Sequence, residues 1–146
     1  MATILYLGDC SHGSSSTDRA NALSRLGHTV IRCDPYKEFH KQLKSRWLGA
    51  IHFRSGYRLL DSRVTKWLRH VIPNEKPDIV WVNSGELFGP ASLKILKRLG
   101  RPIVLYMNDD PMGKRDGRRF DSLVRALKFY DFCIVVREVN VSEFKA

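Results

Sequence analysis

Short apolar runs alternate along the chain with stretches in which apolar residues recur every three or four positions. Five runs bounded by Gly, Pro, Asn or Asp are typical of strands, and the run 103–107 is typical of a strand buried on both faces. The five runs are residues 3–7 (TILYL), 28–33 (HTVIRC), 78–82 (DIVWV), 103–107 (IVLYM) and 132–136 (FCIVV). Helical crossovers between such strands are right-handed and favour a doubly wound parallel sheet. We expect an α/β, Rossmann-like fold in three α/β/α layers, with strand order 3-2-1-4-5.

The expected helices carry start and stop signals. A helix from about Ser16 can end at Gly27, and Pro90 suits the first turn of a helix that Gly100 can terminate. Asp116 can cap the helix that precedes the last strand, and a further helix is expected from about Ser142. These signals place one helix in most of the connections between strands.

The segment 36–74 differs from the other connections because it is longer and basic. Its apolar spacing predicts two amphipathic helices around a loop near Ser55, Gly56 and Tyr57. One helix normally suffices for a crossover, so we expect a basic helical insertion within a single domain spanning 1–146. Trp47 and Trp67 should pack inward, with the Lys and Arg side chains exposed.

Charge is the one unusual feature of the composition. The net charge is +10, and nine Lys or Arg between Lys37 and His70 face only Glu38 and Asp61. Such a surface attracts acidic lipid headgroups, phosphorylated substrates or nucleic acid, or it serves only solubility. Nucleic acid is the least favoured of these partners, since no helix-turn-helix or base-reading motif accompanies the charge.

Other classes of protein are disfavoured by the composition. No apolar run approaches the roughly 20 residues that span a bilayer, and the start MATILYLGDC lacks the features of a signal peptide. We therefore expect a cytoplasmic protein, with peripheral contact to a membrane allowed by the basic segment. The three cysteines show no CxxC spacing, so neither a disulfide framework nor a metal site is expected.

Polar residues follow three of the predicted strands, and the carboxyl ends of parallel strands are where open α/β sheets bind ligands. The loop GDCSHGSSS matches neither GxGxxG nor GxxxxGK[ST], although a helix N-terminus there favours an anion. Adjacent carboxylates after the fourth strand repel each other, which can raise one pKa as a general base requires. The candidate catalytic residues are His12, Asp109 and Asp110. The candidate acceptor-binding residues are Gly8, Ser11, Gly13, Ser14, Asn83, Ser84, Glu86 and Asn108. Turn formation and helix capping explain many of these residues equally well.

Three long segments carry a family resemblance: ILYLGDCSHGSSSTDRANALSRLGHTV, PDIVWVNSGELFGPASLKILKRLGRPIVLYMNDDP and FYDFCIVVREVNVSEFKA. Together they resemble the N-terminal half of GT-B glycosyltransferases, specifically those similar to the spore maturation protein CgeB. The resemblance implies an acceptor-binding domain that faces a donor-binding domain of the same polypeptide across a cleft. It implies no cofactor bound by this domain and a nucleotide sugar in the complete enzyme. The donor domain has no counterpart within 1–146, so we expect this part alone to be inactive.

Two further classes of function remain. The chain could be a stand-alone module without chemistry that docks on an anionic membrane or nucleic acid through its basic segment. A receiver domain is the weakest alternative, because Asn83 stands where a phosphorylatable Asp is required and Arg137 where a Lys is required.

Overall fold

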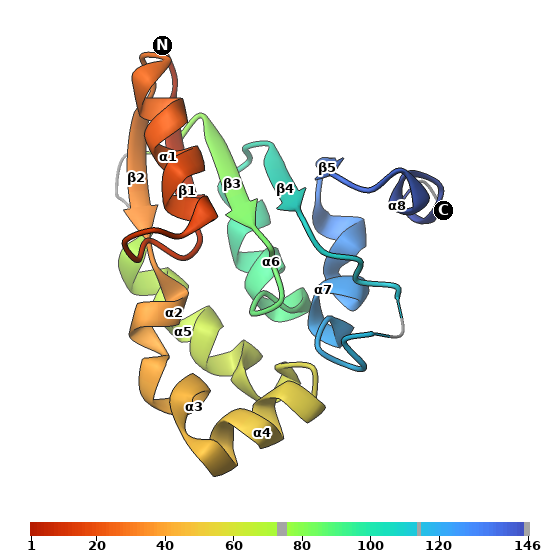
Figure 1. Cartoon of the computed structure of the whole chain (residues 1–146). Coiled ribbons are helices and arrows are strands. Elements are labelled where there is room, and N and C mark those ends of the chain that lie inside the picture. Colours follow the sequence, from red (N-terminus) through yellow and green to blue (C-terminus); the bar gives the residue numbers. More distant parts are fainter. Residues whose placement is uncertain (73–75, 114, 145–146) are drawn as a thin grey trace.

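The computed structural model describes residues 1–72, 76–113 and 115–144 and contains one five-stranded parallel sheet (Figure 1). The prediction of an α/β, Rossmann-like fold is confirmed. The strands are β1 (Thr3–Leu7), β2 (Thr29–Cys33), β3 (Ile79–Asn83), β4 (Ile103–Met107) and β5 (Phe132–Val135). Each lies within one residue of the expected range at either end, because the apolar runs are bounded by residues that break strands.

The strand order is β2-β1-β3-β4-β5, so the predicted order 3-2-1-4-5 misplaces the third strand. After β2 the chain crosses over to the far side of β1, and β3 pairs in parallel with both β1 and β4. Strand β2 is therefore an edge strand, which suits its exposed Thr29 and Arg32. The point at which the strand order reverses lies between β1 and β3, and ligand crevices form at such points.

Helices flank both faces of the sheet. Helix α1 (Ser15–Arg25) lies on one face, while α5 (Asp61–Val71), α6 (Pro90–Lys97) and α7 (Asp121–Ala126) lie side by side on the other (Figure 1). The main core lies between the sheet and these three helices. It contains Leu5, Leu7, Val64, Leu68, Val80, Val82, Leu93, Leu96, Ile103, Leu105, Met107 and Leu123.

The face that carries α1 is covered over only part of its width. Phe132 and Ile134 of β5, which alternate with the more buried Cys133 and Val135, are exposed on it. Helix α8 (Glu138–Glu143) follows β5, so the helix expected from about Ser142 begins earlier than predicted. Asp116 does not cap α7, whose N-cap is Phe120.

The predicted basic insertion is helical but more divided than expected. It contains α2 (Pro35–Glu38), α3 (His40–Lys44), α4 (Arg46–Arg54) and a 3-10 turn (Arg58–Leu60) before α5. Ser45 is both the C-cap of α3 and the N-cap of α4, so it divides the helix that apolar spacing alone predicts to continue. Residues 73 and 74 of the predicted insertion lie outside the described part of the chain.

The two tryptophans of the insertion differ in environment. Trp67 is half-buried and its ring lies 6.1 Å from that of Phe39 in an edge-to-face arrangement. Trp47 is exposed, so the prediction that it packs inward is wrong. Its four-residue spacing from Leu43 does not put both on one face, because the break at Ser45 separates α3 from α4.

We call residues 35–60 the hood, because they project beyond the carboxyl ends of the strands (Figure 1). The hood is anchored at its end by Asp61, whose carboxylate accepts hydrogen bonds from the first turn of α6. The Ser122 hydroxyl also donates to the Gly56 carbonyl. These bonds fix the hood relative to the sheet and its covering helices. None of the described helices is long and apolar enough to cross a membrane.

Candidate functional site

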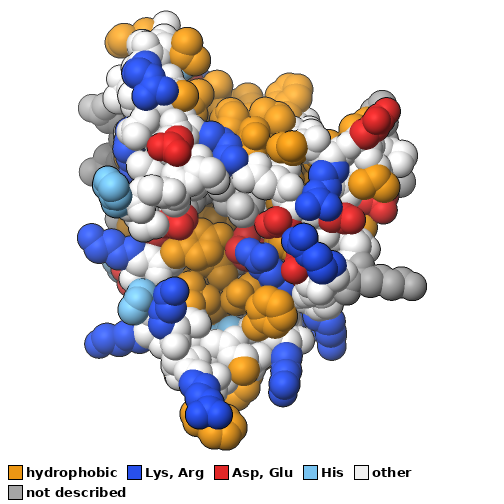
Figure 2. Space-filling view, in the orientation of Figure 1, with side chains coloured by type: hydrophobic (Ala, Val, Ile, Leu, Met, Phe, Trp, Pro, Cys, Tyr) orange, Lys and Arg blue, Asp and Glu red, His pale blue; other side chains and the backbone are white. Residues whose placement is uncertain are grey.

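A cleft of about 1280 Å³ lies between the hood and the carboxyl edge of the sheet. Its walls come from the loops after β1, β2 and β3, from the hood, from α5 and from Arg119. Figure 2 shows hydrophobic side chains in this hollow with charged side chains around it. The lining residues include Asp9, Cys10, Ser11, Asp34, Tyr36, Lys37, Leu43, Phe53, Tyr57, Trp67, Glu86 and Arg119. Apolar surface with a few placed polar groups is typical of a small-molecule site.

Glu86 is the most deeply placed charged group of the cleft, since only 3% of the residue is exposed. Its Oε1 accepts a hydrogen bond from Arg119 Nη2 at 2.9 Å. Its Oε2 is buried and has no hydrogen-bond partner among the described residues. A buried carboxylate oxygen without a partner costs free energy, so it is a ready acceptor for a ligand hydroxyl.

The two residues that precede Glu86 have an unusual backbone conformation. After β3, Ser84 and Gly85 are both left-handed, with φ of 67° and 74°. A Cβ at Gly85 would lie 2.9 Å from side-chain carbons of Leu105 and Leu123, so glycine is required by packing as well as by φ. Strain of this kind at a strand end turns the chain so that Glu86 faces the cleft.

Two tyrosines share the surroundings of Glu86. Burial, followed by the charge of Glu86 and hydrogen bonding to its carboxylate, raises the pKa of Tyr36 well above its ordinary value. Burial and the charge of Glu86 also raise the pKa of Tyr57. Both hydroxyls therefore remain protonated at neutral pH. The Tyr57 hydroxyl can donate a hydrogen bond to a ligand, whereas that of Tyr36 adjoins the Glu86 carboxylate itself.

Cys10, in the loop after β1, also lines the cleft. Burial, followed by the charge of Asp34, raises the pKa of its thiol to about 11. The nucleophile in cysteine chemistry is the thiolate, which is scarce at neutral pH under these conditions. Cys10 therefore serves this site as packing surface.

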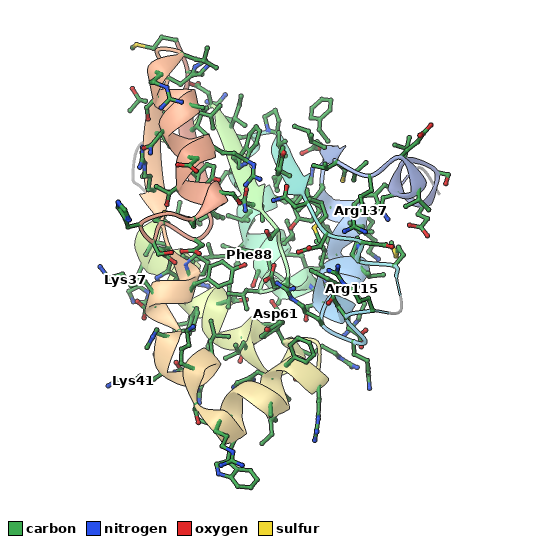
Figure 3. All side chains as sticks on the ribbon, in the orientation of Figure 1. Lys37, Lys41, Asp61, Phe88, Arg115 and Arg137 are labelled. Atoms are coloured by element: carbon green, nitrogen blue, oxygen red, sulfur yellow. The ribbon has the colours of Figure 1, made fainter. Side chains whose placement is uncertain are left out.

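Arg119 links Glu86 to the loop after β4. Besides Glu86, its guanidinium lies 3.9 Å from Asp109 and over the ring of Phe120. Burial would lower the pKa of Arg119, but the charge of Glu86, the hydrogen bond to it and the charge of Asp109 together outweigh burial, so the pKa is raised. Arg115 lies 3.7 Å from Asp109, and Figure 3 shows it at this rim. Asp109 thus lies within 4 Å of two guanidinium groups, those of Arg115 and Arg119.

Asp110, the second carboxylate of the pair, does not line the cleft. Its Oδ1 accepts hydrogen bonds from Asn140 Nδ2 at 2.8 Å and from the Gly113 amide at 2.9 Å. These bonds, that of Asn140 first, lower its pKa. Repulsion between the two adjacent carboxylates was expected to raise the pKa of one of them, but the pKa of Asp110 is lowered. Lys114, in the same turn, lies outside the described residues.

The two asparagines at the strand ends are joined by a residue that the sequence argument missed. Arg19 of α1 donates to Asn83 Oδ1 and Asn108 Oδ1, both at 3.0 Å, and its guanidinium lies 4.2 Å from the centre of the Tyr106 ring. Tyr6 also donates to Asn83 Oδ1, at 3.2 Å. The amide oxygens proposed for ligand binding are therefore occupied within the protein.

The loop after β1 is closely packed at its start and exposed at its tip. A Cβ at Gly8 would lie 2.6 Å from Ser16 Oγ, so this position must be glycine. Ser14 is the N-cap of α1 and accepts from the Thr17 amide at 3.1 Å. His12 and Gly13 are exposed and do not line the cleft, whereas Ser11 does.

The structure thus brings Ser11, Glu86 and Arg119 to one cleft, with Asp109 beside it, and places His12 and Asp110 outside the lining. Arg19 and Arg119 were missed because each contacts residues more than 30 positions away, which no local pattern encodes. Among the described residues, no three His, Cys, Asp or Glu side chains are grouped as a metal site would require. No protein-family model matches the chain, and a search of curated proteins finds no similar sequence.

Proposed function

We propose that this chain is the acceptor-binding domain of a glycosyltransferase, which transfers a sugar from a nucleotide-sugar donor to a hydroxyl group of an acceptor. The observation that carries the proposal is the unpartnered Oε2 of Glu86 in a cleft at the carboxyl edge of a parallel sheet. An acceptor hydroxyl can donate to this oxygen. The protonated Tyr57 can donate to a further acceptor oxygen.

The mixed character of the cleft supports a polyhydroxylated acceptor. Trp67, Phe53 and Leu43 give it apolar walls against which the carbon face of a sugar can pack, while its charged groups can bind hydroxyls. Lys37, Lys44 and Arg32 at its margin would favour an acceptor that also bears a negative charge.

In this proposal the catalytic base is also a residue at the carboxyl edge of the sheet. Asp109 is the preferred candidate, because it adjoins Arg119 and the cleft, whereas Asp110 is engaged by Asn140. His12 would have to reach the acceptor from the exposed loop after β1. The nucleotide sugar would be held by a donor-binding domain on a longer polypeptide, and transfer needs both substrates held in register.

The proposal is tested by titrating residues 1–146 with two sets of ligands. Methyl glycosides and polyol phosphates stand in for the acceptor, and uridine and guanosine diphosphate sugars for the donor. The indole N–H resonance of Trp67 reports binding in the cleft, and calorimetry gives affinity. We expect at least one acceptor analogue to shift this resonance, with nucleotide sugars binding weakly.

Glu86→Gln should weaken acceptor binding about tenfold or more, because a hydrogen bond to a charged group contributes about 1.5–3 kcal/mol and each 1.4 kcal/mol corresponds to about tenfold in affinity. Glu143→Gln, at an exposed carboxylate on α8, is the matched control and should have no effect. Micromolar binding of a nucleotide sugar, or acceptor binding that Glu86→Gln leaves unchanged, would refute the assignment.

A further inference from the structure

The outer surface of α4 at the tip of the hood exposes large apolar side chains. Trp47 is 78% exposed, Ile51 50% and Leu48 48%, and we call these three residues the α4 patch. Trp47 and Ile51 are four residues apart and Leu48 and Ile51 three apart, so they lie on adjoining parts of one helical surface. The inward face of α4 is formed instead by the buried His52. Figure 2 shows hydrophobic atoms beside Lys or Arg side chains at the end of the molecule formed by α3 and α4.

The segment that carries the α4 patch is rich in exposed basic side chains. All nine Lys and Arg residues between Lys37 and Arg69 are exposed, and none of them forms an ion pair with a carboxylate of the described residues. Arg46 and Arg54 are at the two ends of α4 itself. Figure 3 shows Lys37 and Lys41 pointing away from the body of the protein. Of the two acids in this segment, Asp61 is engaged by α6, which leaves Glu38 as the exposed one.

We propose that the hood docks on the surface of a lipid bilayer that contains anionic lipids, with the α4 patch inserted at the headgroup boundary. An amphipathic helix with Trp and aliphatic residues on one face and Lys or Arg beside them binds this boundary through apolar burial and attraction to anionic headgroups. A tryptophan suits that depth, because its ring is apolar and its N–H is polar.

The combination of features favours a bilayer over other anionic partners. Nucleic acid would account for the positive charge but not for three large apolar side chains exposed together. Another protein surface would account for the apolar side chains, but the excess of unpaired cations in the same segment matches a surface of many negative charges. The inference does not depend on the proposed glycosyltransferase function, since it uses only the outer surface of the hood.

Vesicle binding by residues 1–146 tests the proposal. The probe is phosphatidylcholine vesicles with and without phosphatidylglycerol, measured by co-sedimentation and by quenching of tryptophan fluorescence with brominated lipid. We expect binding to the anionic vesicles only, weakened as salt rises from about 0.1 M to about 1 M, which shortens the Debye length from about 10 Å to about 3 Å. Trp47→Ala should reduce the partition coefficient by on the order of tenfold. Arg46→Gln with Arg54→Gln should reduce it by a similar factor.

Phe132→Ala is the matched control, because Phe132 is also an exposed aromatic residue but lies on β5, away from the hood. It should leave vesicle binding unchanged. Absence of binding to anionic vesicles would overturn the proposal, as would loss of binding in Phe132→Ala with retention in Trp47→Ala. Self-association that Trp47→Ala abolishes would instead identify a second copy of the chain as the occupant. Tighter binding to duplex DNA that Trp47→Ala does not alter would identify nucleic acid.

Discussion

Asp61 joins the hood to the sheet-covering helices, and its replacement should destabilise the whole domain. Its Oδ1 accepts from the Ser92 amide at 3.1 Å and from Ser92 Oγ at 2.6 Å, and its Oδ2 accepts from the Ala91 amide at 3.1 Å. Helix α6 has Gly89 as its N-cap, which offers no side chain to bind these amides. Asp61 therefore performs from another helix the role that an N-cap residue usually performs (Figure 3).

The size of the effect follows from these contacts. Loss of an N-cap side chain costs about 0.5–2 kcal/mol, and hydrogen bonds to a charged group contribute about 1.5–3 kcal/mol. Such terms are not additive within one cluster, so we expect Asp61→Ala to lower the free energy of unfolding by about 2–4 kcal/mol. Asp61→Asn keeps one acceptor oxygen without the charge and should cost roughly half as much.

Urea unfolding monitored by circular dichroism measures both effects, and Glu38→Ala is the matched control. Glu38 is an exposed acid of the same segment, and its replacement should change stability by less than about 0.5 kcal/mol. Hydrogen exchange at the Ala91 and Ser92 amides should accelerate in Asp61→Ala more than exchange in β4. If Asp61→Ala unfolds at the same urea concentration as Glu38→Ala, the hydrogen bonds to α6 do not hold the hood in place.

Three further predictions use the same unfolding assay. Arg19→Met should lower the free energy of unfolding by about 1–3 kcal/mol, because Arg19 donates hydrogen bonds to Asn83 and Asn108 at the ends of two strands. The control Arg25→Met, on the same helix, should cost less than about 1 kcal/mol. Equal effects would show that the bonds of Arg19 are not stabilising. Gly85→Ala should cost about 2–4 kcal/mol, because alanine combines a left-handed backbone with a clash against the core, and a loss below about 1 kcal/mol would contradict this geometry. Asn140→Ala should be less stable than the wild type at neutral pH, because it loses the hydrogen bond to Asp110. The lowered pKa of Asp110 means that this bond stabilises the fold only while the carboxylate is charged. The difference in stability between the two proteins should therefore narrow as pH falls below 3.8. A difference independent of pH would show that the bond to Asp110 is not its source.

The sequence predicted the strands better than their arrangement. Apolar runs between breakers are a local signal, and all five strands lie where these runs predicted. The position of β3 depends on which side of β1 the hood segment crosses to, and no local pattern determines that side. The exposed Arg32 in β2 was the available sign that β2 is an edge strand.

The candidate site was predicted only in part, because local patterns do not show which distant side chains meet. The rule that ligands bind at the carboxyl ends of parallel strands identified Glu86 and Asp109. The rule does not tell a residue that is free to bind a ligand from one that is bonded within the protein. Glu86 is buried beneath the hood, whereas Asn83 accepts a hydrogen bond from Arg19. That difference arises from side chains of α1 and the hood, which come from distant parts of the chain.

The hydrogen bonding at the rim decides where along it a ligand should bind. On the side of α1, the oxygens of Asn83 and Asn108 accept from Arg19, so a ligand there would have to replace bonds that each contribute about 0.5–1.5 kcal/mol. Beneath the hood, Glu86 Oε2 is buried without a partner, which costs about 1–3 kcal/mol until a donor arrives. A hydroxyl that binds Glu86 relieves this cost, whereas a hydroxyl at the asparagines gains little. A ligand hydroxyl is therefore expected to bind beneath the hood, where the serine-rich loop after β1 contributes Ser11 to the lining of the cleft.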